Sequence, residues 1–338
     1  MFDFDDSRLE DPAVLADASP LLRNLASSGA RVRREAATAE APLTALTAVD
    51  RPRAVIAYGP EARLLRAVLE PVCPVPFVAW PALGLPGWVG PLDVVLVIGR
   101  RGPESLAVAH EAVRRGARLI AVCPPDSQLA LQAASRSTTL LPVGTGDPLA
   151  AAVVALVALN QLGLGPSTSP DAIAAAMDAV SESCSARTDV SVNPAKKMAL
   201  DLADAAPLVW GGSVLAARAS RRIVEALRLA SGRVGLSADS SDVVGLIQQV
   251  RPRDPFADPF EESGAERRPG LVLVDDGMDD ESAAESRVRL ERTAEAVEIR
   301  VTRLAHTTDS VMERYATVLL TGLFGAAYLQ IGLGRTTS

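Results

Sequence analysis

The chain has 338 residues, of which 48% are hydrophobic and 22% are charged, and its formal net charge is −7. A chain of this length can bury two hydrophobic cores, so we expect two domains. The acidic balance excludes a nucleic-acid-binding protein that relies on a basic surface, but it leaves open an anionic metabolite in a local basic pocket.

The first half of the chain predicts leading helices and then an alternation of strands and helices. Apolar residues recur at helical spacing over residues 11–37. Apolar runs of strand length follow at 54–59, 76–80, 93–99, 118–123 and 139–144, and a long apolar helix is predicted at 147–163. These strands lack strict alternation, as expected of a parallel sheet covered on both faces. We therefore predict a first domain over residues 1–165.

The second half repeats this scheme after a linker-like segment at 164–170 and a helix at 171–185. Strands are predicted at 207–210, 233–238, 271–277 and 298–304, with helices between them and a closing helix from residue 308. The charged, proline-rich segment 252–270 predicts a mobile loop. The predicted fold class is α/β, with two doubly wound, flavodoxin-like parallel-sheet domains related by duplication, 1–165 and 171–338.

Several features bear on the cellular compartment. The first twelve residues are acidic, unlike the basic and then apolar start of a signal peptide. The cysteines Cys73, Cys123 and Cys184 are far apart and show no CxxC spacing, so neither a disulfide framework nor a zinc site is indicated. The uncharged run 316–334 is long enough to cross a membrane, but its threonine, tyrosine and glutamine residues favour a core helix. We expect a cytoplasmic protein that does not bind membranes.

The stretch 193–228 carries the main functional signal. Its strand leads into a turn of three small residues, Gly211, Gly212 and Ser213. Such a turn at the start of a helix presents backbone N–H groups to anions. Along one side of the following helix lie four charged residues, Arg218, Arg221, Arg222 and Glu225. They fit either a solvated helix face with ion pairs or a carboxylate set among guanidinium groups in a site.

This stretch also contains three motifs in a fixed order. They are an Asn-x-Ala-Lys helix, a strand that ends in an aromatic residue and glycine, and an arginine followed seven residues later by glutamate: Asn193, Ala195, Lys196, Trp210, Gly211, Arg218 and Glu225. In these motifs the stretch resembles the second sugar-isomerase (SIS) domain of the bifunctional phosphoglucose/phosphomannose isomerase family. Val224, Ala226 and Arg228 replace the asparagines and lysine that flank the glutamate in that family.

The resemblance implies two SIS domains with an active site between them. It implies aldose–ketose isomerisation of glucose 6-phosphate or mannose 6-phosphate, with Glu225 as the catalytic base. It also implies a phosphate cradle of hydroxyls and backbone N–H groups after two strands of the first domain. Here Gly59 is followed by a proline, which removes a donor, and the second loop has no hydroxyl before Ser105. Arg100 and Arg101 could replace these hydroxyls with positive charge; the alternative is a solvated turn. The candidate substrate-binding residues are Gly59, Arg100, Arg101, Ser105, Gly211, Gly212, Ser213, Arg218 and Arg221.

Ring opening of the sugar requires an acid, for which the family uses a histidine. Ser240 occupies that position here, and an unassisted serine is a poor acid near neutral pH. His306, which follows the strand 298–304, is a candidate substitute; the alternative is a loop residue with no function. An arginine that the family carries before its interdomain helix is replaced by Leu149.

Four aspartates follow the apolar run 271–274: Asp275, Asp276, Asp279 and Asp280. Clustered carboxylates at a strand end suit Mg²⁺, but acidic residues also favour the start of a helix. We predict a helix start here and no metal site.

Two function classes remain. One is an aldose–ketose isomerase with Glu225 as the base, Arg218 or Arg221 as electrostatic support, and Ser240 or His306 as the acid. The other is a non-catalytic protein that binds a sugar phosphate or a protein partner. Family membership favours the first, whereas the loss of several members of one catalytic constellation favours the second. The expected partners are a phosphorylated hexose and a second copy of the chain in a homodimer, with no cofactor and no nucleic acid.

Overall fold

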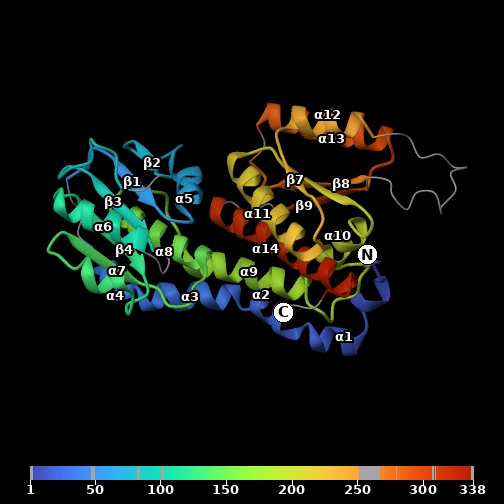
Figure 1. The fold of residues 1–338 in the computed structure, drawn as a ribbon, viewed down its shortest axis with the longest axis horizontal. Helices are drawn as coiled ribbons and strands as arrows, with labels where there is room; N and C mark the ends of the chain where they lie inside the picture. Colours follow the sequence, from blue (N-terminus) through green and yellow to red (C-terminus); the bar gives the residue numbers. More distant parts are fainter. Residues whose placement is uncertain are drawn as a thin grey trace, which may run out of the picture. The chain divides into compact units, whose positions relative to one another are not determined.

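The structure, a computed structural model, describes residues 3–46, 50–81, 84–99, 103–250, 267–278, 280–306, 308 and 310–335. The chain forms two compact units, Ser28–Ala175 and Met1–Ser27 together with Ala176–Ser338. Each unit is a parallel sheet covered by helices on both faces, as Figure 1 shows. The mixed α/β fold with two doubly wound parallel sheets is therefore confirmed.

The unit Ser28–Ala175 contains a five-stranded parallel sheet in the order β2-β1-β3-β4-β5. Its strands are β1 (Val55–Tyr58), β2 (Phe77–Ala79), β3 (Val94–Ile98), β4 (Arg118–Cys123) and β5 (Thr138–Pro142). Its helices are α3 (Ser28–Thr38), α4 (Glu40–Thr44), α5 (Ala62–Leu69), α6 (Pro103–Arg114), α7 (Gln128–Gln132) and α8 (Pro148–Gln161). The order is that of flavodoxin-like sheets, in which the chain winds to opposite sides from a switch point between β1 and β3.

Both faces of this sheet are buried. Ile56, Val95 and Leu119 belong to one apolar core with residues of α6 and α7. On the opposite face α8 packs against β3 and β4, and α3 packs against α8. Because α8 lies between the sheet and another helix, it is apolar on all sides, which explains its run of alanine, valine and leucine.

The other unit contains a four-stranded parallel sheet in the order β7-β6-β8-β9. Its strands are β6 (Ala206–Gly211), β7 (Leu236–Ser237), β8 (Pro269–Asp275) and β9 (Val301–Ala305). The remaining helices are η1 (Asp6–Leu9), α1 (Pro12–Asp17), α2 (Ser19–Ala26), α9 (Pro170–Ser183), α10 (Pro194–Asp201), α11 (Val214–Ser231), α12 (Ser240–Gln248), α13 (Glu281–Ala296) and α14 (Val311–Gly332). This strand order repeats that of the first four strands of the other sheet, as duplication predicts.

Two sets of helices cover this second sheet. Leu208 and Leu273 share a core with Val243 of α12 and Leu290 of α13. On the opposite face α14 packs against α10 and α11, as can be followed in Figure 1. Among the described helices α14 alone is long and apolar enough to cross a membrane, and 89% of its most apolar window is buried inside the protein. The prediction of a core helix over the uncharged run is confirmed.

The leading residues pack within the second unit. The N–H of Asp5 donates to Gly332 O at 2.9 Å, and Arg8 Nε donates to Ile331 O at 2.8 Å, both at the end of α14. The predicted division at 1–165 and 171–338 differs from the compact units in this respect, because η1 to α2 are fixed to the last helix of the chain. The predicted loop 252–270 lies mostly outside the described residues, which resume at residue 267.

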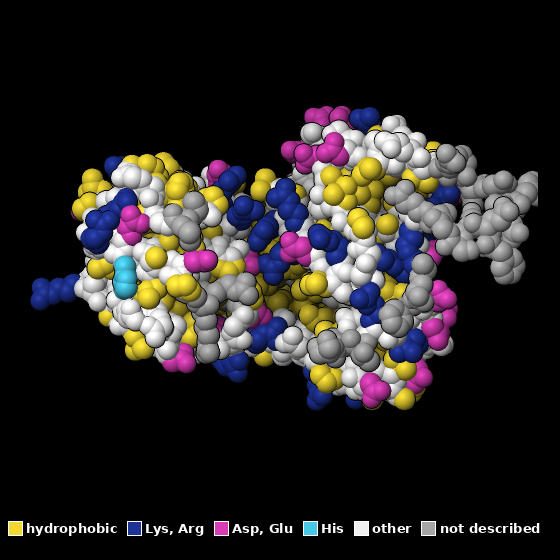
Figure 2. Space-filling model, in the orientation of Figure 1, with side chains coloured by type: hydrophobic (Ala, Val, Ile, Leu, Met, Phe, Trp, Pro, Cys, Tyr) yellow, Lys and Arg dark blue, Asp and Glu magenta, His cyan; other side chains and the backbone are white. Residues whose placement is uncertain are grey.

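Hydrophobic side chains also reach the surface. Leu229 and Val234, near the end of α11, are 83% and 86% exposed. Figure 2 shows hydrophobic side chains among charged ones on the visible face of each unit. Exposed apolar residues of this kind are normal for globular proteins and need no special explanation.

Candidate functional site

The four strands of the second sheet are parallel, so their carboxyl ends share one edge. In open α/β sheets, ligands bind outside this edge at the switch point, which here lies between β6 and β8. Gly211 is the last residue of β6 at that point, and Gly212 follows it. A Cβ on Gly211 would overlap the backbone of Ala216, and a Cβ on Gly212 would lie 2.8 Å from the Cβ of Ala283. The two glycines therefore let α11 and α13 begin close to the sheet.

Ser213 is the N-cap of α11, and its hydroxyl is fully engaged. Oγ accepts a hydrogen bond from Ala216 N at 2.9 Å and donates one to Asp276 Oδ2 at 2.5 Å. Asp276 is only 3% exposed, and its Oδ1 accepts from Met278 N at 3.3 Å. The Ser213 hydroxyl therefore donates its one proton to the buried side chain of Asp276. The sequence predicted that this hydroxyl would bind a phosphate.

Asp275, next to Asp276, is neutralised by two arginines. Its Oδ2 accepts from Arg287 Nη1 at 3.1 Å and from Arg303. Burial alone would raise the pKa of Asp275, but the hydrogen bonds from Arg303 and Gly277 N–H and the two guanidinium charges outweigh it and hold this pKa below its ordinary value. The carboxylate stays charged at neutral pH within this cluster.

The prediction of a helix start after β8 is confirmed by Asp280. It is the N-cap of α13, and its Oδ1 accepts from Ala283 N at 2.7 Å. Asp279 lies outside the described residues. In the part of the chain that the structure describes, no three His, Cys, Asp or Glu side chains are placed to hold a metal ion.

Ser240 and His306 also lie at the carboxyl edge of the second sheet. Ser240 is the first residue of α12, which follows β7, and His306 follows β9. The backbone N–H of His306 donates to Asp275 O at 3.2 Å. The Nε2 atom of its imidazole is buried and has no hydrogen-bond partner. Burial, with the charge of Arg314, lowers the pKa of His306, and Glu313 opposes this. The lowered pKa favours the neutral imidazole, which does not favour His306 as a proton donor.

The charged face of α11 is separate from this edge. Glu225 is eleven residues after Val214, which places it about 16 Å along the helix axis from the first residue. It is exposed, and no ion pair joins it to a described residue. Arg221 is also exposed and Arg218 is half-buried. The predicted i,i+3 and i,i+4 ion pairs to Glu225 are thus not formed.

The first sheet contributes fewer described site residues. Gly59 follows β1 at φ +124°, and a Cβ there would overlap the carbonyl oxygen of Ile98. This residue closes the switch point between β1 and β3 and can only be glycine. Ser105 is buried within α6, at 7% exposure. Arg100 and Arg101 lie outside the described residues.

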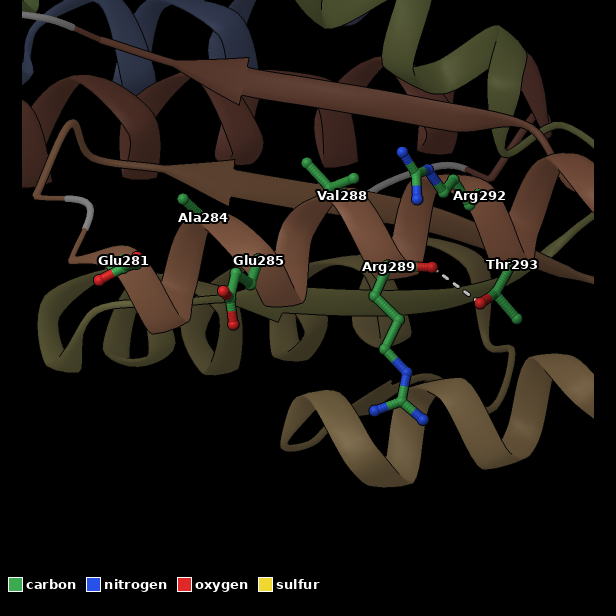
Figure 3. Close-up of a pocket in the computed structure, with 7 residues that line it drawn as sticks. All are labelled: Glu281, Ala284, Glu285, Val288, Arg289, Arg292 and Thr293. Atoms are coloured by element: carbon green, nitrogen blue, oxygen red, sulfur yellow. Dashed lines mark hydrogen bonds between the residues drawn. The ribbon is translucent and has the colours of Figure 1, made fainter.

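A surface concavity of about 560 Å³ lies elsewhere, on α13. Its lining residues all come from this one helix: Glu281, Ala284, Glu285, Val288, Arg289, Arg292 and Thr293. Figure 3 shows them along the helix, with Thr293 Oγ1 donating to Arg289 O at 2.7 Å. None of the predicted site residues lines it, so we do not assign the concavity to the site.

The residue that sequence reasoning assigned to a different role is Asp276. Its position after an apolar run was visible, but Asp276 is one of four aspartates that follow this run, and all four favour a helix start. Only the register of β8 beside β6 shows that Asp276, and not Asp275, meets Ser213.

Comparison with known proteins supports this fold. Residues 191–335 match the family model described as the bacterial phospho-glucose isomerase C-terminal SIS domain. No curated protein sequence matches the chain.

Three solved structures illustrate the similarity of fold. A glucose-6-phosphate isomerase like protein from Thermus thermophilus is 16% identical, with a TM-score of 0.53 over 96% of this chain and 92% of that one. The C-terminal domain of glucosamine-fructose-6-phosphate aminotransferase from Francisella tularensis is 10% identical, with a TM-score of 0.60 over 93% and 96%. Tagatose-6-phosphate ketose/aldose isomerase from Escherichia coli is 12% identical, with a TM-score of 0.56 over 95% and 93%. Residues 191–335 therefore resemble a SIS domain of the phosphoglucose isomerase family, and the whole chain is similar in fold to these solved structures.

Proposed function

We propose that this chain binds a phosphorylated hexose. The observation that supports this most is the pair of glycine turns, at Gly59 and Gly211, each closing the switch point of a doubly wound sheet. Open sheets of this kind take anionic ligands at that point. The names of the three similar proteins given above each include a phosphorylated sugar, which suggests that the anion is a sugar phosphate.

Aldose–ketose isomerisation is the second candidate. Glu225 would carry a proton between C1 and C2, and Arg218 or Arg221 would stabilise the negative charge of the enediolate. Two difficulties stand against it: Glu225 is exposed and lies about 16 Å along α11 from the sheet edge, and the chain has no evident acid to open the ring. An unassisted Ser240 is a poor acid near neutral pH, and burial lowers the pKa of His306, which disfavours its protonated form. The lack of a suitable acid at Ser240 and His306 favours a protein that binds the sugar phosphate without efficient turnover. Glucose 6-phosphate and mannose 6-phosphate are the proposed ligands.

Thermal unfolding tests the binding proposal. Glucose 6-phosphate, mannose 6-phosphate or fructose 6-phosphate should raise the midpoint of unfolding in a concentration-dependent way. A ligand at one hundred times its Kd stabilises the folded state by about 2.7 kcal/mol. Glucose and inorganic phosphate, tested separately, are the controls for the sugar and the anion. If no hexose phosphate shifts the midpoint more than both controls do, the proposal fails.

A coupled assay for fructose 6-phosphate formed from either aldose phosphate separates the two candidates. We expect turnover to be absent or very slow. Any turnover that Glu225→Gln abolishes would establish the isomerase instead. Glu285→Gln is the matched control, since Glu285 is an exposed carboxylate of α13 and its loss removes the same charge.

The assembly and location of the protein belong to the same proposal. We propose a homodimer in the cytoplasm, on the resemblance of residues 191–335 to a SIS domain. Size-exclusion chromatography with light scattering tests the dimer, and a single-chain mass at micromolar concentration would contradict it.

A further inference from the structure

The Asn-x-Ala-Lys motif carries the family resemblance, yet it belongs to no part of the proposed site. Both of its polar side chains are buried, with Asn193 at 0% and Lys196 at 1% exposure. A buried lysine is uncommon and requires partners for its donors. Those partners all lie in the turn between α9 and α10.

Lys196 binds two backbone carbonyls of this turn. Its Nζ donates to Thr188 O at 2.9 Å and to Ala186 O at 3.1 Å. It also lies 5.7 Å from the centroid of the Tyr328 ring, on α14. A buried ammonium group ordinarily pairs with a carboxylate. Lys196 instead contacts two backbone carbonyl oxygens and the face of the Tyr328 ring.

Asn193 and Tyr328 bind the two carbonyls that come before these. Asn193 Nδ2 donates to Ser185 O at 3.0 Å, and the Tyr328 hydroxyl donates to Cys184 O at 2.7 Å. Asn193 Oδ1 also caps α10 by accepting from two N–H groups of its first turn. Side chains from only two helices therefore hold four carbonyls within a five-residue segment.

The turn has little other anchorage. Every residue from 185 to 192 is at least partly exposed, and Val192 is 69% exposed. A segment that buries few apolar side chains opens at a low free energy unless specific bonds restrain it. Here most of those bonds are made by the three buried side chains; Val190 N–H also donates to Glu10 Oε1 at 3.2 Å, and the Thr188 hydroxyl donates to Glu182 O at 3.0 Å.

We infer that Lys196, Asn193 and Tyr328 form a latch that fixes the turn 184–188 to α10 and α14, and that the turn opens locally when the latch is lost. The turn directly follows α9, the helix in which the chain passes from one compact unit to the other. The latch therefore fixes the first residues after α9, 184–188, to α10 and α14. This inference is independent of the proposed ligand.

Arg187 provides the test, because it is exposed between the two carbonyls that Lys196 binds, and trypsin cleaves after arginine. We expect the Arg187–Thr188 bond to resist trypsin in the wild-type protein. Lys196→Met keeps an unbranched side chain but removes both hydrogen bonds, so cleavage at this bond should be about tenfold faster or more. Lys197→Met is the control, since Lys197 is the exposed neighbour and its loss changes the charge equally. Mass spectrometry of the fragment that ends at Arg187 reports this bond alone.

A folded Lys196→Met protein that is cleaved at the wild-type rate would overturn the latch. Circular dichroism establishes whether the variant is folded. If it is not, Tyr328→Phe tests the same turn, because it removes only the hydroxyl that binds Cys184 O. Faster cleavage after Arg187 in that variant supports the latch, and an unchanged rate contradicts it.

Discussion

The hydroxyl of Ser213 accepts from the first turn of α11 and donates to Asp276, whose carboxylate is almost fully buried. Through this one pair, the turn after β6 is joined to the turn after β8. Asp276 thus lies beside one of the two switch points proposed to receive an anion, so the binding proposal rests more on the turn at Gly59. We infer that Ser213 is a structural cap and that a phosphate bound by this chain does not take its proton.

Replacing Asp276 tests this bond. Asp276→Ala should lower the free energy of unfolding by about 2 kcal/mol, because the Ser213 hydroxyl and Met278 N–H lose a charged acceptor in a buried place. Urea denaturation measures the change. Glu285→Ala removes an exposed carboxylate of α13 and should leave stability nearly unchanged. Equal effects of the two substitutions would show that Asp276 is not a structural acceptor.

The ion pairs of Asp275 predict a pH dependence. Its folded pKa is lowered from 3.8, so the unfolded chain binds this proton more readily. The stabilisation is therefore fully present above pH 3.8 and is lost as the pH falls through the lower folded pKa. Arg303→Met removes one partner and should flatten the loss of stability below about pH 4. Arg289→Met, on the exposed face of α13, is the control. An unchanged acid profile in Arg303→Met would refute this assignment.

Single residues could be predicted only in part. The seven-residue spacing from Arg218 singled out Glu225, but not that it is exposed and makes no ion pair with described residues. Burial lowers the pKa of His306, and the sequence around His306 does not show how far a side chain is buried. Of the predicted residues, Gly211, Gly212, Ser213, Ser240 and His306 meet at one sheet edge, and this follows from their positions after parallel strands.

Among the elements, the turn between β6 and α11 depends most on its glycines. Gly211→Ala should lower stability by about 2 kcal/mol or more, because its Cβ would overlap the backbone of Ala216 and force α11 to move. Gly245→Ala, in α12, is the matched control with the opposite sign. Its Cβ meets nothing within 4 Å, so the higher helix propensity of alanine should stabilise the protein by up to about 1 kcal/mol. Thermal unfolding followed by circular dichroism measures both. A stabilising Gly211→Ala would contradict the close packing described here.

The elements themselves were largely predictable from apolar runs. The runs at 54–59, 93–99 and 118–123 contain β1, β3 and β4, since strands covered on both faces are continuously apolar. The run at 233–238 predicted a full strand, but β7 has only two residues, Leu236–Ser237. It is an edge strand in which Leu236 is 44% exposed, and hydrophobicity alone does not reveal how much of a run pairs.

At the scale of the molecule, both sheets wind from a switch point in the same order, as duplication predicts. The packing of η1 to α2 against the end of α14 was not predictable, because an amphipathic helix shows that it covers a core but not which core. The shared fold also leaves the activity open, since one fold hosts many functions. The chemistry of the residues at the sheet edges therefore decides between a binding protein and an enzyme.

Isothermal titration calorimetry of the wild-type chain with glucose 6-phosphate tests the central claim, that this chain binds a phosphorylated hexose. We predict saturable heat of binding with glucose 6-phosphate or mannose 6-phosphate and none with glucose at the same concentration. Titrations of glucose 6-phosphate, mannose 6-phosphate and fructose 6-phosphate that all give no more heat than glucose would contradict it.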